Sequence, residues 1–272
     1  MLFLQGNSNI FSSDHTPAGH RFIIISHRHK FIFLKPRKVA GTSVEVALAQ
    51  HCGDDDIVTP VTAFDPQWDE EEYDHPGTKQ RGYLRHSTLP VIRRRLGRPL
   101  WDAYFKFAIV RNPWDLVVSQ YYWATREVDW QPFRKTIGGS LSRFWKYPLR
   151  VRRNVFALGA NVARTFWKLE DVTFDFFVAY MLHYYPPNGR FYFDRSGTVG
   201  LDFLIRYENL QNDYASVCER IGLPPSELPS LKTKSRAERK HYTTYYDDRS
   251  RERVAKTYRK HIEHFGYHFE EP

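Results

Sequence analysis

The first candidate for chemistry in this chain is the short motif KPRKVAGTS, residues 35–43, which combines cations, a glycine and two hydroxyl side chains. Phosphate binding at a helix start needs converging backbone N–H groups, small residues, hydroxyl donors and a cation. Lys38, Gly41, Thr42 and Ser43 supply these features together. The motif therefore predicts an anion-binding loop between a strand and a helix. The structural alternative is a capped helix that follows a lysine at a sheet edge.

The position of the lysine distinguishes this motif from a Walker A loop. Lys38 lies three residues before Gly41, whereas a Walker A lysine directly follows a glycine and precedes a serine or threonine. The motif therefore lacks the arrangement that presents a hydroxyl to magnesium beside the lysine. A group transfer without a metal is the natural interpretation, with Lys38 neutralising the leaving group. The run 54–56 of three aspartates lacks the glycine-centred pattern of a metal loop, so we expect no metal site there.

A second unit with the same strand-loop-helix form lies about seventy residues downstream, in FAIVRNPWDLVVSQYY (107–122). Arg111 would stand where a buried strand ends, at the edge where open α/β sheets bind ligands, and Ser119 follows eight residues later in a helix. Arg111 could grip a phosphate bidentately while Ser119 adds a hydroxyl. Two separated anion sites suit a nucleotide with phosphates at both ends of its ribose. Taken singly, the alternatives are an ion pair at a sheet edge and an ordinary helix serine.

Together the two motifs resemble the sulfotransferase superfamily. The segments 52–61, 201–224 and 239–269 further resemble its carbohydrate-type branch, the sulfotransferase family 2-like proteins, in the same order along the chain. The resemblance is weakest between Trp130 and Gly200. It implies a donor, 3′-phosphoadenosine 5′-phosphosulfate (PAPS), and a P-loop-like three-layer α/β fold with a central, mainly parallel sheet flanked by helices.

The resemblance also implies roles for individual residues. Lys38 would stabilise the bridging oxygen as the sulfuryl group departs, Arg111 and Ser119 would hold the 3′-phosphate, and Val39 lacks the hydroxyl that many members carry at its position. The remaining nucleotide-binding residues would be Arg37, Ala40, Gly41, Thr42 and Ser43 in the first loop and Lys234 and Arg236 in the basic segment 231–242.

An acceptor hydroxyl must lose its proton as it attacks sulfur, so a general base is needed. His86 is our first choice, because related carbohydrate enzymes place a histidine in a comparable stretch. The alternatives are His75, His27, Glu72 and Asp74. His241 is expected to be structural, and Tyr207 with Glu208 is expected to support the nucleotide site by packing.

The segment 130–169 contains no Asp or Glu, and its arginines and lysines alternate with aromatic residues. This mixture suits stacking on sugar rings and pairing with sulfate or carboxylate groups. It would equally suit peripheral contact with an anionic membrane surface that carries a glycolipid. We therefore expect residues 130–200 to form a helical insertion that binds the acceptor.

The elements that position these motifs alternate between strands and helices, which predicts an α/β layer. The predicted strands are 21–26, 30–35, 105–110 and 201–207. The predicted helices are 42–51, 87–96, 114–126, 175–185, 212–223 and 249–264, and 54–80 is predicted to be a loop. Thr42 or Ser43 is expected to be the N-cap of the first of these helices. No linker-like stretch interrupts the chain, so we expect one domain over 1–272.

Composition restricts the remaining functions. The 272-residue chain carries a formal net charge of +9, which favours anionic partners, but it contains no nucleic-acid recognition motif. Cys52 and Cys218 are too few for a disulfide framework, so a reducing, cytoplasmic setting is expected, with the Golgi lumen as alternative for a trimmed domain. No stretch has the length of a membrane span. A sugar kinase and a non-enzymatic binder of anionic glycans or nucleic acid remain alternatives, and the oligomeric state cannot be deduced.

Overall fold

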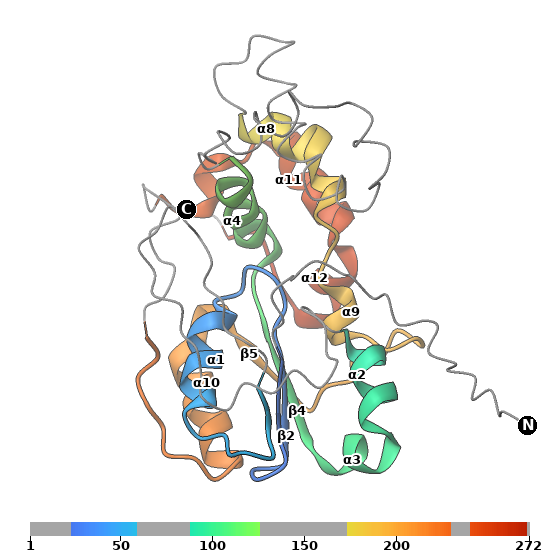
Figure 1. The fold of residues 1–272 in the computed structure, drawn as a ribbon. Coiled ribbons are helices and arrows are strands. Elements are labelled where there is room, and N and C mark those ends of the chain that lie inside the picture. The colour runs from blue at the N-terminus through green and yellow to red at the C-terminus, as the bar shows by residue number, and fades with distance from the viewer. Residues whose placement is uncertain (1–22, 59–87, 126–172, 230–239, 271–272) are drawn as a thin grey trace, which may run out of the picture.

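A five-stranded mixed sheet occupies the centre of the protein in the computed structural model, which describes residues 23–58, 88–125, 173–229 and 240–270 (Figure 1). Its strands lie in the order β3-β1-β2-β4-β5. The strands are β1 (Ile23–Ser26), β2 (Phe31–Leu34), β3 (Ile57–Val58), β4 (Phe105–Val110) and β5 (Phe203–Arg206). β1 and β2 are buried at every position, as their unbroken runs of β-branched and aromatic residues predict.

The strand directions place three carboxyl ends at one edge of the sheet. β2 pairs parallel with β4, and β4 pairs parallel with β5. β1 pairs antiparallel with both β2 and β3, so the predicted parallel arrangement applies to only half of the strand pairs. The reason is the connection 27–30, whose four residues suffice for a hairpin but are too few for a parallel crossover.

Helices cover both faces of the sheet. Figure 1 shows α1 and α10 on one face, α2, α3 and α9 on the other, and α4 with α11 beyond the carboxyl edge of β4. The helices are α1 (Gly41–Ala49), α2 (Leu89–Leu96), α3 (Arg98–Ala103), α4 (Pro113–Thr125), α8 (Phe174–Phe176), α9 (Gly189–Tyr192), α10 (Leu210–Arg220), α11 (Asp248–Thr257) and α12 (Arg259–Phe265).

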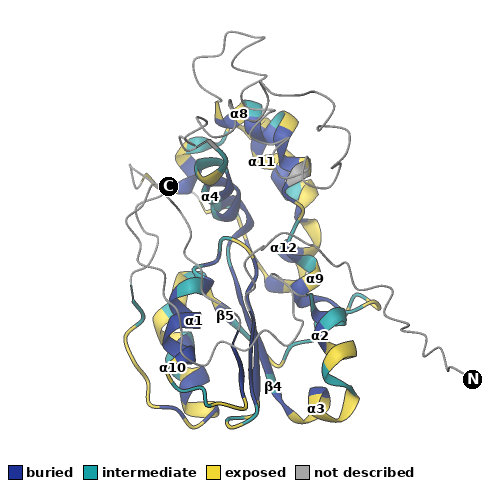
Figure 2. Ribbon diagram, in the orientation of Figure 1, coloured by how far each residue is buried: buried dark blue, intermediate teal, exposed yellow. Residues whose placement is uncertain are grey.

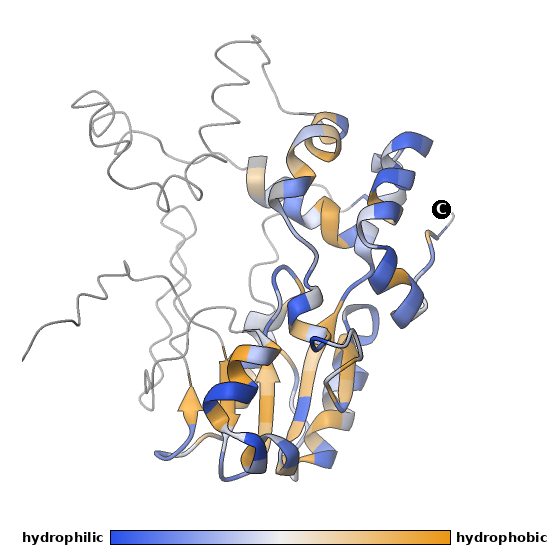
Figure 3. Cartoon of the chain, turned by 90° about the vertical axis from the view of Figure 1, so that its right-hand side faces the viewer, coloured by the Kyte–Doolittle hydropathy of each residue, from blue (hydrophilic) through white to orange (hydrophobic). Residues whose placement is uncertain are grey.

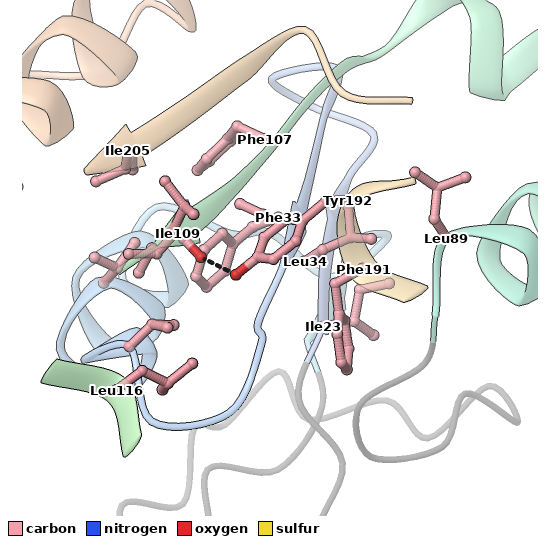
Figure 4. Packing of buried hydrophobic residues seen from close by; sticks show 14 of the residues in the cluster. Ile23, Phe33, Leu34, Leu89, Phe107, Ile109, Leu116, Phe191, Tyr192 and Ile205 are labelled. Atoms are coloured by element: carbon pink, nitrogen blue, oxygen red, sulfur yellow. Dashed lines mark hydrogen bonds between the residues drawn. The ribbon is translucent and has the colours of Figure 1, made fainter. Parts of the chain in front are cut away.

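The hydrophobic core lies between these layers. Figures 2 and 3 show buried, apolar strands at the centre and exposed residues on the outer helix faces. The described part of the predicted insertion, residues 173–200, contributes Phe177, Phe191 and Tyr192 to the same core cluster. Figure 4 shows the Tyr192 hydroxyl reaching β4, where it donates a 2.8 Å hydrogen bond to the carbonyl of Ile109. This segment is therefore anchored to β4, the strand that directly precedes Arg111.

Most predicted elements are confirmed within a few residues, but α3 and α9 lie where no element was predicted, and three further differences occur. β3 lies inside the stretch predicted to be a loop, because Ile57 and Val58 find a partner on the free edge of β1. The last predicted helix is two helices, α11 and α12, separated at Tyr258. The predicted helix 175–185 is a short α-helical turn followed by a π-helical turn, Phe177–Met181, and a 3₁₀ turn.

A buried histidine on α12 makes the fold sensitive to acid. The His261 side chain packs edge-on against the rings of Tyr192, Phe193 and Phe265. Burial lowers its pKa from 6.5 to about 4. Because the unfolded chain then binds a proton before the folded chain does, stability is lost as the pH falls from about 6.5 to 4.

We expect His261→Phe to remove this component of acid sensitivity. Between about pH 7 and pH 5 the wild type should lose roughly 2 kcal/mol of unfolding free energy through His261 alone, and the variant should be spared that loss. Urea unfolding at both pH values measures the difference, with exposed His268→Gln as control. Equal pH dependence in wild type and His261→Phe would show that His261 is protonated without penalty in the folded protein.

Candidate anion-binding active site

Three loops meet at the carboxyl edge of the sheet. They follow β2 at residues 35–40, β4 at 111–112 and β5 at 207–209. Because these three strands are adjacent and parallel, their carboxyl ends face the same side. The loop that carries Lys38 and the loop that carries Arg111, seventy-three residues apart in sequence, are therefore neighbours in space.

The first loop has an unusual backbone. Lys38 and Ala40 both adopt left-handed conformations, with φ of 63° and 59°, although neither is glycine. Such residues are strained, and alternating backbone handedness turns successive N–H groups toward a common point. Val39 between them is 1% exposed, so its side chain anchors the loop in the core while both neighbours stay partly exposed. The loop thus has the geometry of an anion cradle.

The start of α1 differs from the prediction in its cap. Thr42 or Ser43 was expected at the N-cap, but Ala40 occupies that position and makes no side-chain cap. After the left-handed residue Ala40, α1 begins at Gly41, one residue before the predicted start of the helix at 42. Thr42 and Ser43 therefore belong to its first turn. Thr42 is partly exposed and Ser43 is buried. The start of α1 therefore has no side-chain cap at Ala40, and the N–H of Ser43 donates to the Ala40 carbonyl at 3.2 Å.

Close packing explains the glycine at position 41. A Cβ atom at Gly41 would lie 2.5 Å from Cγ of Lys35. The Lys35 side chain cannot move away easily, because its amine forms a buried 2.7 Å ion pair with Glu45 on α1. Gly41 therefore lets the loop pass close to this ion pair.

We expect Gly41→Ala to distort the cradle. The clash with Lys35 should displace the loop, reduce nucleotide affinity at least about tenfold and destabilise the fold by about 1–3 kcal/mol. Gly53→Ala is the matched control, because a Cβ there meets nothing within 4 Å. Calorimetric titration and thermal unfolding of both variants measure the two effects. Wild-type behaviour of Gly41→Ala would mean that the loop does not need its observed path.

Arg111 connects the second loop to the first. Its Nη1 donates a 3.0 Å hydrogen bond to the carbonyl of Lys38, while Nε and Nη2 each lie 2.7 Å from Oδ2 of Asp115. Its guanidinium also lies over the Tyr207 ring, 3.9 Å from the ring centre. The ion pair that the sequence offered as an alternative is therefore present. Each terminal nitrogen carries two N–H groups and makes one of these contacts, so the guanidinium keeps one N–H on each terminal nitrogen for a further acceptor.

Ser119 lies on the face of α4 to which Arg111 is bound. It follows Asp115 by four residues, so the two side chains project one turn apart on the same helix face. Both are partly exposed, whereas residues 116–118 and 120 are buried. Arg111, Asp115 and Ser119 thus form a partly exposed row along α4 and the loop that precedes it.

A buried polar network holds the second loop in place. The Asn112 side chain accepts from the N–H of Trp114 and donates to the Tyr242 hydroxyl and the carbonyl of His268. Glu208 accepts from the backbone N–H of Asn112 at 2.6 Å. The prediction that Tyr207 and Glu208 support the site by packing agrees with these contacts.

No sequence pattern indicated a role for Asn188, which contacts the first loop. Its carboxamide accepts from the N–H of Arg37 at 3.3 Å and donates to the carbonyl of Arg37 at 3.0 Å. Asn188 is 4% exposed and lies in the sequence PPNGR, within the predicted acceptor-binding segment. An asparagine before glycine reads as a turn residue, so only the fold reveals that its side chain reaches residue 37.

Several predicted residues lie outside the described part of the chain. These are the candidate bases His86, His75, Glu72 and Asp74, the basic residues Lys234 and Arg236, and the segment 130–169.

His27 lies within the described residues, and its position contradicts the prediction that it could act as the general base. It lies in the β1–β2 turn, at the edge of the sheet opposite Lys38, where its Nδ1 lies 2.6 Å from the Tyr104 hydroxyl. His241 contacts Thr243 and Glu270, as expected of a structural histidine.

Two further searches cover the described residues. Within them, no three His, Cys, Asp or Glu side chains converge to form a metal-binding group. Nor does any helix in the described ranges have the length and apolar character needed to cross a membrane.

The fold and the two coupled loops define an α/β protein with a candidate anion-binding site at one edge of its sheet. A family model described as "Sulfotransferase family" matches residues 21–268, and the chain therefore belongs to the sulfotransferase family. It is also 31% identical over 134 residues to an uncharacterized protein of Archaeoglobus fulgidus; the match covers 49% of this chain and 81% of the relative. No solved structure matches.

Proposed function

We propose that this protein transfers the sulfuryl group of PAPS to a hydroxyl of a carbohydrate or glycolipid, by in-line displacement without a metal. The observation that carries the proposal is the 3.0 Å hydrogen bond from Arg111 to the carbonyl of Lys38, which couples two anion-binding motifs in a chain of the sulfotransferase family. We also infer that the helices on both faces of the sheet form the P-loop-like, three-layer arrangement of that family.

Lys38 would act on the leaving group. As the acceptor oxygen forms its bond to sulfur, the bond from sulfur to the bridging oxygen breaks, and negative charge develops on that oxygen. The Lys38 amine would neutralise this charge. The backbone N–H groups of Ala40, Gly41, Thr42 and Ser43, with the exposed side chain of Arg37, would hold the 5′-phosphate beside it.

Arg111 and Ser119 would hold the 3′-phosphate. The guanidinium is already oriented by Asp115 and Tyr207, so little conformational entropy is lost when its remaining N–H groups bind two phosphate oxygens. Lys234 and Arg236 would close over the nucleotide from the segment 231–242. One motif would hold the 5′ end of the nucleotide and the other its 3′-phosphate. The hydrogen bond from Arg111 to Lys38 would keep the two motifs at a fixed distance from each other.

The acceptor side rests on residues outside the described ranges. His86 would remove the proton of the acceptor hydroxyl, and the basic aromatic segment 130–169 would bind the acceptor or an anionic membrane that carries it. A His86→Ala variant should lose turnover but keep nucleotide affinity, and unchanged turnover would remove His86 from the mechanism.

We place the activity in a reducing compartment, with the cytoplasm preferred to the Golgi lumen. Cys52 and Cys218 are both free thiols, and burial raises the pKa of Cys52 to about 12, which keeps it unreactive. Mass spectrometry of protein isolated from its source under alkylating conditions tests this placement. Finding either cysteine in a mixed disulfide would contradict it.

A pair of nucleotides tests the proposed function. 3′-Phosphoadenosine 5′-phosphate (PAP) should raise the melting temperature, AMP should do so much less because it lacks the 3′-phosphate, and EDTA should change neither result. A sugar kinase would instead require ATP with magnesium. A non-enzymatic binder of polyanions would bind with a steep salt dependence and no preference for PAP. An unchanged melting temperature at saturating PAP would contradict our proposal.

A further inference from the structure

Asn188 pairs with both polar groups of a single backbone residue. Its Oδ1 accepts from Arg37 N–H and its Nδ2 donates to Arg37 C=O, so one carboxamide satisfies a donor and an acceptor at once. Asn188 is almost fully buried, and Arg37 lies immediately before Lys38. The contact therefore acts on backbone next to the lysine, and any side chain could occupy position 37 without changing it.

The core holds Asn188 itself in place. It directly precedes α9, whose residue Phe191 donates its N–H to the Asn188 carbonyl at 2.9 Å. Tyr192, in the same helix, donates a 2.8 Å hydrogen bond from its hydroxyl to the carbonyl of Ile109 on β4. The turn and α9 are thus tied to β4, two residues before Arg111, through Tyr192, and to the first loop through Asn188.

The two peptide groups that flank the Cα atom of Lys38 are both held by side chains. Asn188 binds the carbonyl of Arg37 on one side, and Arg111 binds the carbonyl of Lys38 on the other. The relative orientation of these two peptide planes is the pair of dihedral angles φ and ψ of Lys38. Since left-handed φ is unfavourable for lysine, it persists only where the surroundings impose it.

We propose that Asn188 is a positioning residue for sulfuryl transfer, which fixes the left-handed backbone of Lys38 together with Arg111 and so directs the lysine amine at the leaving oxygen. This role rests on the proposed function, because it matters for catalysis only if Lys38 acts on a leaving group. The proposed role makes α9 and the turn before it part of the donor site, although both lie far from Lys38 in the sequence.

The first test removes the carboxamide. Asn188→Ala should lower kcat about 10- to 100-fold, while the dissociation constant of PAP changes less than about threefold, because misdirection of Lys38 costs most in the transition state. Asn212→Ala, at an exposed asparagine on α10, is the matched control. Amide hydrogen exchange of residues 35–43 should accelerate in Asn188→Ala but not in Asn212→Ala. Wild-type kcat together with wild-type exchange would overturn the proposal.

A double-mutant cycle separates positioning from general stabilisation. If Asn188 acts through Lys38, adding Asn188→Ala to Lys38→Ala should reduce the transfer rate by no more than about threefold beyond Lys38→Ala alone. Independent effects that multiply would contradict the proposal. A merely structural role would produce such independent effects.

An isosteric variant keeps the test valid if Asn188→Ala does not fold. Asn188→Asp retains the acceptor for the N–H of Arg37 but, when ionised, presents a second oxygen to the carbonyl of Arg37 and repels it. Protonation restores the donor, so the activity of this variant relative to wild type should rise at least about fivefold from about pH 7.5 to 5.5. A constant ratio would count against the proposal. Inactivity of the wild type itself with PAPS would instead overturn the proposed function, while the exchange measurement would still test the loop contact.

Discussion

Replacing Lys38 by glycine is expected to abolish sulfuryl transfer without weakening the fold. The amine would no longer neutralise the leaving oxygen, so the transfer rate should fall by about a thousandfold or more. Glycine adopts a φ of 63° without strain, so the unfolding free energy should stay within about 1 kcal/mol of wild type or rise. Few variants separate catalysis from folding this cleanly, because removing a functional residue usually also removes packing.

A second left-handed lysine supplies the control. Lys30 has φ of 52° and is exposed in the β1–β2 turn, at the opposite edge of the sheet. Lys30→Gly should change stability as Lys38→Gly does and leave transfer unchanged. Thermal unfolding and initial rates of both variants measure this contrast. Transfer by Lys38→Gly at more than about a tenth of the wild-type rate would remove Lys38 from the chemistry.

Replacing Arg111 by alanine should weaken PAP binding at least about 100-fold, because both its proposed contacts with the 3′-phosphate and its hydrogen bond to the Lys38 carbonyl would be lost. The affinity for AMP should fall much less, since AMP lacks the 3′-phosphate. Arg111→Lys keeps the positive charge beside Asp115 but loses the planar fork, so it should still weaken PAP binding about tenfold or more. Isothermal titration with the two nucleotides measures these differences.

The matched control is another arginine-aspartate pair with the same four-residue spacing. Arg98 pairs with Asp102 on α3, where its side chain is 83% exposed, compared with 9% for Arg111. Arg98→Ala should leave PAP affinity within about twofold of wild type and change stability by less than about 1 kcal/mol. Equal effects of the Arg98 and Arg111 substitutions would mean that Arg111 contributes only through net charge.

The sequence predicted the parts of the site that depend on local pattern. β2 is a run of buried apolar residues, and β4 is mostly so. Each strand leads directly into a polar motif, so Lys38 and Arg111 could be assigned to strand ends. Placing both at one sheet edge followed from the parallel direction of alternating strands and helices. β1 was predicted as a strand, but its direction depends on the short hairpin turn and on β3, whose two residues are too few for a reliable pattern.

Contacts between distant residues could not be predicted from spacing. Asn188 reaches Arg37 across 151 residues, and Arg111 reaches the Lys38 carbonyl across seventy-three. The left-handed conformation of Ala40 also lacks a sequence signal, because alanine rarely adopts it and glycine would be expected there. Such conformations arise where tertiary contacts outweigh local preference, which is where functional loops are commonly found.

Transfer of radiolabelled sulfuryl groups from PAPS to a panel of glycans and glycolipids tests the central claim most directly. With magnesium removed by EDTA, the wild type should label at least one hydroxyl-bearing acceptor, Lys30→Gly should label it equally, and Lys38→Gly should not label it above background. Failure of the wild type to label any acceptor while it binds PAP would contradict the proposed transfer. Labelling that survives the loss of Lys38 would contradict its mechanism.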